Sequence, residues 1–75
     1  MSGVMPWGLL WYDEEGTLEE RVRRAMERYR EKHGAVPNAC FVHPSEVDGA
    51  VTIDECRVVA NPTVLKHHLW IGEAE

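Results

Sequence analysis

Apolar residues between Thr17 and His33 recur at intervals of three and four, which is the spacing of one face of an α-helix. The stripe consists of Leu18, Val22, Ala25, Met26, Tyr29 and His33. Thr17 and Glu20 have the spacing of a capping box, in which each side chain accepts a hydrogen bond from the other residue's amide. Gly34 suits the position after the last helical turn. The pattern predicts a helix over residues 17–33.

Two short apolar runs flank this helix and have the length and composition of strands. The first covers residues 7–12 (WGLLWY), which read as an inner strand preceded by an N-terminal extension over residues 1–6. The second covers residues 39–43 (ACFVH) and ends at Pro44, because proline cannot donate to a strand ladder. Two such strands in one sheet should run parallel and be joined by a right-handed crossover.

The C-terminal third alternates short apolar runs with turn residues. Residues 51–60 form either a hairpin or one bulged strand, and the Asp54-Glu55 pair between the two halves favours the hairpin. Residues 67–71 form a last strand, with alternate side chains on opposite faces. The predicted fold is a single α+β domain over residues 1–75. In it, one amphipathic helix packs on a small mixed sheet of four to five strands, with a β-α-β start and an antiparallel C-terminal part.

The length of the chain limits how stable the predicted fold can be as a monomer. The chain has 75 residues, of which 44% are hydrophobic and 28% are charged, as in ordinary globular domains. A domain of this size buries only about 60 to 65% of the surface of its unfolded chain, so that a metal, a disulfide or a partner chain often adds stability. Self-association to a homo-oligomer is therefore predicted.

The charge of the chain and its cysteine content indicate which kinds of partner it could bind and in which cellular compartment it is expected. Residues 17–33 carry six basic and four acidic residues, and because the whole chain has a net charge of -5, the rest carries -7. Nucleic acid is thus an unlikely partner. No segment resembles a signal peptide or a membrane span. Cys40 and Cys56 lie in predicted strands, without the dense spacing of a disulfide scaffold, which favours a soluble cytoplasmic protein with reduced cysteines.

A metal site is the first chemical possibility, because zinc binds thiolate and imidazole ligands. The available ligands are Cys40, His43, Cys56, His67 and His68. On a strand, residues 40 and 43 point to opposite faces, and so do residues 67 and 68. No metal or other cofactor is therefore expected, although histidines from neighbouring strands could still meet and bind zinc. The alternative interpretation is that the cysteines are small core residues.

Acid/base chemistry is the second possibility. The carboxyl ends of the first two strands and the start of the helix should meet at one rim of the sheet. His43 would lie there with Asp13 and Glu46, and a histidine beside carboxylates is a reasonable proton-transfer pair. These residues also suit ordinary turns, so an enzymatic function is not the favoured prediction.

Protein interaction is the function that the sequence favours. Arg21, Arg24 and Arg28 follow one side of the helix and could form a basic ridge for an acidic partner, although salt bridges within the helix are the commoner use of such residues. Trp7 and Trp70 are large rings for so small a core and are natural interface anchors. We expect a small, non-enzymatic interaction or assembly module. A metal-binding or acid/base site using His43, its neighbouring carboxylates or His67 and His68 is the alternative.

Overall fold

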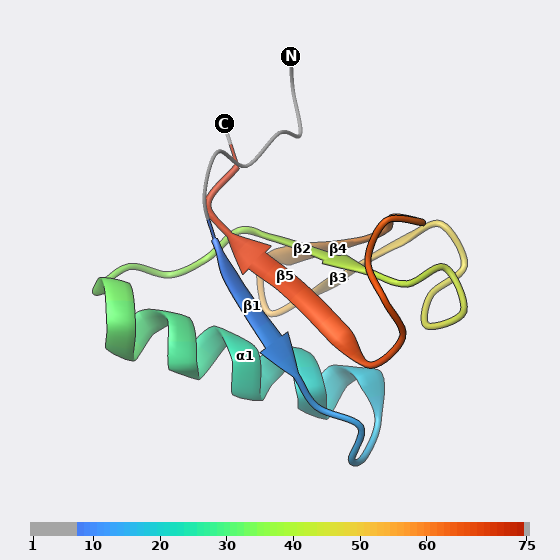
Figure 1. The fold of residues 1–75 in the computed structure, drawn as a ribbon. Coiled ribbons are helices and arrows are strands. Elements are labelled where there is room, and N and C mark those ends of the chain that lie inside the picture. The colour runs from blue at the N-terminus through green and yellow to red at the C-terminus, as the bar shows by residue number, and fades with distance from the viewer. Residues whose placement is uncertain (1–7, 75) are drawn as a thin grey trace.

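One helix packs on a five-stranded mixed sheet in a computed structural model that describes residues 8–74 (Figure 1). In chain order the elements are β1 (Leu9–Tyr12), α1 (Leu18–His33), β2 (Ala39–Val42), β3 (Ala50–Ile53), β4 (Cys56–Ala60) and β5 (His68–Gly72). The predicted α+β class, with a β-α-β start and a mixed sheet, is confirmed. The expected extension over residues 1–6 lies outside the described residues.

The strands are ordered β1-β5-β2-β4-β3 across the sheet. Only β2 and β4 pair in parallel, and the other three neighbouring pairs are antiparallel. Because β1 and β2 both pair antiparallel with β5, they run in the same direction, as predicted, but β5 lies between them. The prediction that the first strand is an inner one was wrong, because β1 pairs with β5 alone among the described strands and forms one edge of the sheet.

Local sequence determines both ends of α1. The Thr17 hydroxyl accepts a hydrogen bond from the Glu20 amide, and the Glu20 carboxylate accepts one from the Thr17 amide at 2.9 Å, so the predicted capping box is present. At the other end Gly34 has φ 70° and donates its amide to the Arg30 carbonyl at 2.8 Å. Within residues 8–74 no helix has the length and apolar composition needed to cross a membrane.

The predicted hairpin over residues 51–60 is confirmed as β3 and β4. Ile53 pairs with Cys56, and Asp54 and Glu55 form the two-residue turn between them. Both turn residues have positive φ angles, 49° and 72°, which is the geometry of the type I′ turn that matches the twist of the two strands.

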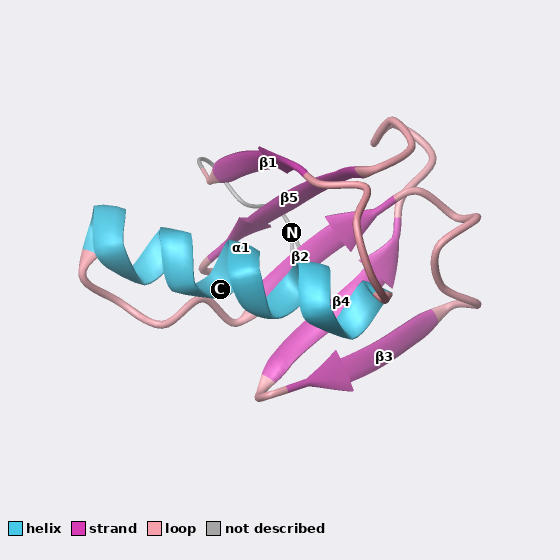
Figure 2. Ribbon diagram, turned by 90° about the horizontal axis from the view of Figure 1, so that it is seen from below, coloured by secondary structure: helices cyan, strands magenta, loops and turns pink. Residues whose placement is uncertain are grey.

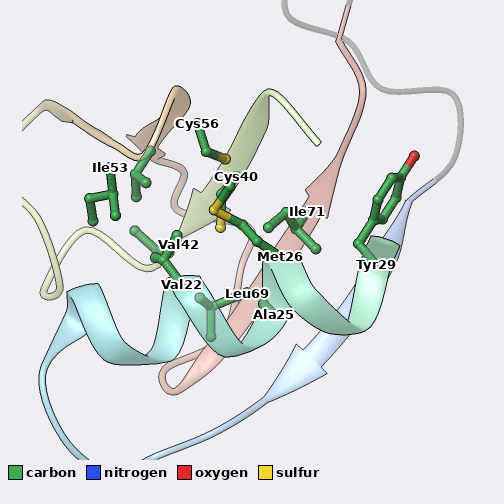
Figure 3. Packing of buried hydrophobic residues seen from close by; sticks show 11 residues of the cluster. Val22, Ala25, Met26, Tyr29, Cys40, Val42, Ile53, Cys56, Leu69 and Ile71 are labelled. Atoms are coloured by element: carbon green, nitrogen blue, oxygen red, sulfur yellow. The ribbon is translucent and has the colours of Figure 1, made fainter. Parts of the chain in front are cut away.

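The core lies between α1 and one face of the sheet (Figure 2). The helix contributes the buried side of its predicted stripe, and Figure 3 shows these side chains against residues of β2, β3, β4 and β5. The buried cluster consists of Val22, Ala25, Met26, Tyr29, Cys40, Val42, Ile53, Cys56, Val58, Leu69 and Ile71. Leu9 and Trp11 of β1 pack against it. His33, the last residue of the predicted stripe, is exposed, and its ring lies 4.4 Å from that of Tyr29.

Candidate functional site

Asp13 follows β1 at the predicted rim, where α1 begins. Its carboxylate accepts hydrogen bonds from Nε and Nη2 of Arg24 at 2.6 and 3.1 Å. The Glu15 amide and the Trp11 indole nitrogen donate to the same carboxylate. These donors, chiefly the Arg24 guanidinium, lower the pKa of Asp13 from 3.8 to about 2. The carboxylate is therefore ionised and surrounded by donors, which suits it to join β1 to α1 and makes it a poor general base.

Glu46 lies at the same rim and binds a buried cation. Arg21 Nη2 donates to Glu46 Oε1 at 2.9 Å, and the two side chains are only 10% and 14% exposed. The arginine lowers the pKa of Glu46, and His67 adds to the effect. His67 Nδ1 lies 3.8 Å from Glu46 Oε2, which is beyond hydrogen-bond distance, and has no hydrogen-bond partner within residues 8–74. Glu46 thus joins the β2–β3 loop to the helix.

His43 ends at this rim as well, but its ring turns toward its own loop. Its Nδ1 accepts a hydrogen bond from the Ser45 amide at 3.0 Å and lies 2.9 Å from the Ser45 hydroxyl. Among the described residues no ion pair joins His43 to Asp13 or Glu46. The three acid/base candidates therefore share one region but do not form a proton-transfer pair.

The metal-ligand candidates lie on both sides of the sheet. Cys40 and Cys56 are fully buried free thiols on the helix side. None of the three histidines lies with them: His68 is at an outward position of β5, and His43 and His67 lie in the loops that follow β2 and precede β5. Across residues 8–74, no three His, Cys, Asp or Glu side chains are grouped so that they could hold a metal ion.

Burial also governs the reactivity of the thiols. It raises the pKa of Cys56 to about 11 and that of Cys40 further. Both sulfurs are therefore protonated at neutral pH, whereas a nucleophilic cysteine needs a lowered pKa and exposure. They act as small apolar side chains in the core.

The arginine ridge predicted on α1 is largely occupied by carboxylates of the same chain. Arg21 is buried, and Arg24 binds Asp13. Arg28 is exposed and lies 3.5 Å from Glu31. Sequence analysis expected pairs within the helix, but Arg21 and Arg24 bind other segments. The burial of Arg21 has no signal in the helical pattern, because it depends on the position of the β2–β3 loop.

The face of the sheet opposite α1 has a different character. We call it the open face, because all five strands belong to one sheet and the one helix of residues 8–74 covers the other side. Its side chains come from outward strand positions: Leu10, Tyr12, Ala39, Phe41, Ala50, Thr52, Arg57, Val59, His68 and Trp70. Trp70, predicted as an interface anchor, lies here. Trp7, the other predicted anchor, lies outside the described residues.

An unbroken row of apolar side chains crosses the open face. Strand pairing places Leu10 beside Trp70, Trp70 beside Phe41, Phe41 beside Val59, and Val59 beside Ala50. We call these five residues the apolar row. Leu10 is 57% exposed, Ala50 is exposed, and the three residues between them are partly exposed. Aromatic and aliphatic cross-strand neighbours of this kind stabilise a sheet, but here no helix or strand of residues 8–74 lies over their outer surface.

The charge of the open face differs from that of the whole chain. None of the outward positions of β1 to β5 holds an aspartate or glutamate, although the chain has 13 of them and a net charge of -5. Arg57 is the one formally charged residue at these positions. A partner could therefore cover the apolar row without removing a carboxylate from water.

Trp70 was predicted from the sequence as an interface anchor, whereas Leu10 and Val59 were not. A signal for them exists in the sequence, because the strand segments LLWY, ACFV and HLWIG are apolar on both faces. Strands of this kind are typical of a sheet covered on two sides. The sequence predicts one helix, and one helix can cover only one face of the sheet.

No protein-family model, curated protein or solved structure matches this chain.

Proposed function

We propose that this protein is a non-enzymatic self-association module, in which the open faces of two copies pack against each other. The apolar row is the observation that carries the proposal. Large exposed apolar surfaces on small proteins mark interaction sites, and aromatic residues near the centre of such a surface contribute most of the binding energy. Trp70 and Phe41 occupy the centre of the row, since their strands are inner ones.

Charge favours a second copy as the occupant. Elsewhere the chain is acidic, so two copies repel each other in most orientations. When two open faces pack together, no carboxylate at an outward strand position of one copy meets a carboxylate at such a position of the other. Packing about a two-fold axis brings identical surfaces together, which suits a row that is apolar from end to end.

The area of the open face determines how strong the association of two copies is expected to be. Five short strands, at a spacing of ~4.8 Å and a rise of ~3.3 Å per residue, span about 24 by 15 Å. Two such faces would bury on the order of 1,000 Å², which is near the lower limit for specific interfaces. We therefore expect a micromolar dimer in equilibrium with the monomer.

The test is sedimentation equilibrium of the full chain between about 1 µM and 1 mM. Leu10→Lys places a charge at one end of the row and should raise the dimer Kd at least tenfold. Val36→Lys is the matched control, because Val36 is a similarly exposed apolar residue (53%, against 57% for Leu10) outside the open face. Circular dichroism should show that both variants are folded.

Two results would overturn the proposal. One is a chain that stays monomeric at 1 mM, which would assign the open face to a different partner or to other residues of this chain. The other is an equal loss of association in both variants, which would indicate a nonspecific charge effect.

A further inference from the structure

Strand β3 forms the edge of the sheet opposite to β1, and Figure 2 shows it as the outermost strand on its side. Three of its four residues, Ala50, Val51 and Thr52, are exposed. The strand contains no proline, lysine or arginine, which are the residues that commonly protect an edge from pairing. In the sequence, β3 is preceded by the β2–β3 loop and followed by the hairpin turn, and the structure describes both segments.

The hairpin determines which backbone groups of β3 point outward. In a two-residue hairpin the residues that flank the turn, here Ile53 and Cys56, exchange hydrogen bonds, and the bonded pairs then alternate along the strands. Val51 and Val58 form the next bonded pair. The amide and carbonyl groups of Ala50 and Thr52 therefore point away from β4, in the positions that an added strand would bind.

Carboxylates flank this edge on both sides. Asp48 precedes β3, and Asp54 and Glu55 follow it. Arg23 Nε binds Asp54 at 2.7 Å, so the exposed Asp48 and Glu55 are the negative charges that remain. Arg57 lies on β4, which would be two strand spacings, or about 9.6 Å, from an added strand. This distance is close to the Debye length, so salt largely screens the charge of Arg57 at that position.

This distribution of charge disfavours pairing of β3 with β3 of a second copy. In the antiparallel register that opposes Ala50 of one copy to Thr52 of the other, Asp48 of each copy comes opposite residue 54 of the other and next to Glu55, whose charge no cation of the chain pairs with among the described ion pairs, at both ends. Like charges directly opposite each other destabilise a strand pair. An extended segment with a positive charge at each end is attracted to the same edge, because its cations lie beside these carboxylates.

We propose that the β3 edge binds an extended, basic segment of a partner protein as a sixth strand. The segment would pair with the outward groups of Ala50 and Thr52 through its backbone. It would carry lysine or arginine on each side of a short stretch of β-branched residues. This mode of recognition gains affinity from main-chain hydrogen bonds and specificity from the flanking residues. Ala50 and Thr52 also belong to the open face, but the proposed segment binds their backbone groups at the sheet edge and not the outer surface of their side chains, and it does not depend on self-association.

The experiment is an NMR titration of the 75-residue chain with the synthetic peptide acetyl-RKVTVKR-amide. Shifts should concentrate at the amides of Ala50 and Thr52, and these amides should exchange with deuterium at least fivefold more slowly in the complex. The peptide acetyl-EEVTVEE-amide has the same central stretch with reversed charges, and we expect it to bind at least tenfold more weakly.

The matched variants are Thr52→Pro and Thr52→Val. Proline removes an amide that points outward and is tolerated at an edge strand, whereas valine retains the amide and the branched side chain. Peptide affinity should fall at least fivefold in the proline variant and stay within twofold in the valine variant. Equal affinity of the two variants, equal binding of the acidic peptide, or unchanged exchange of the Thr52 amide in the unmodified protein would each overturn the proposal. The exchange measurement remains decisive if the proline variant fails to fold.

Discussion

Arg21, Arg23 and Arg24 lie close together on α1, yet each binds a carboxylate from a different segment of the chain. Their partners are Glu46 of the β2–β3 loop, Asp54 of the hairpin turn and Asp13 after β1. The first pair is buried, so removing Glu46 would leave an uncompensated cation in the interior, which is costly. The other two are more exposed and contribute less, because water screens them. Together they align the helix on the sheet.

Replacement of Asp13 should change how stability depends on pH. Its pKa is about 2 in the folded protein and near 3.8 in the unfolded chain. Its contribution is therefore complete above pH 4 and is lost as pH falls toward 2. We expect Asp13→Asn to cost about 1 kcal/mol at pH 7, a discounted figure because Arg24 is 44% exposed, and to cost only a small part of that near pH 2, where half of the folded carboxylate is protonated.

Urea unfolding of both proteins at several pH values between 2 and 7 measures this difference. Asp48→Asn is the control, because Asp48 is an exposed carboxylate in the β2–β3 loop. A constant difference between Asp13→Asn and the unmodified protein over the whole pH range would contradict the assigned role of Asp13.

At the scale of elements, the β3–β4 turn carries local strain. Glu55 has φ 72°, a conformation that costs an L-residue other than glycine, asparagine or aspartate about 1 kcal/mol. Glycine adopts it freely but loses more entropy on folding. We expect Glu55→Gly to stabilise the protein by about 0.5 kcal/mol, measured as a higher urea midpoint. Glu55→Ala removes the same charge but keeps the Cβ atom, so it should give no such gain. Equal midpoints for the two variants would show that charge, not backbone geometry, governs this turn.

Strand β1 shows why an apolar run does not reveal its place in a sheet. WGLLWY has the composition of an inner strand, yet Leu10 and Tyr12 are 57% and 56% exposed at the sheet edge. Its inner position is taken by β5, the last strand in the sequence. Hydrophobicity predicts which residues need a covered environment, but the pairing of distant segments decides whether the monomer supplies it.

At the scale of the whole molecule, the proposed dimer should link stability to concentration. Association that involves only folded chains stabilises them by mass action. If the dimer Kd is micromolar, raising the concentration from about 10 µM to 1 mM should stabilise each chain by about 1 kcal/mol and raise Tm by about 5 °C. Differential scanning calorimetry over this range measures the shift. Because its dimer Kd is at least tenfold higher, Leu10→Lys should need an at least tenfold higher concentration to reach the same gain in Tm. A concentration-independent Tm for the unmodified chain would contradict coupling between folding and association.

The sequence by itself determined the local features of this protein. The helix with its capping box, the hairpin at Asp54-Glu55 and the alternation of β5 were predicted, because each depends on residues a few positions apart. The candidate rim was also predicted in part, since Asp13, His43 and Glu46 end elements that meet there.

Tertiary structure alone decided the features that join distant segments. The insertion of β5 between β1 and β2 moves the first strand to the edge and completes the apolar row from residues 10, 41, 50, 59 and 70. The position of the β2–β3 loop buries Arg21 beside Glu46. None of these contacts has a sequence period, because strand order depends on the free energy of the whole packed core and not on local preference. The residues proposed to carry function were therefore visible in the sequence as apolar strand positions, and only the fold placed them on one surface.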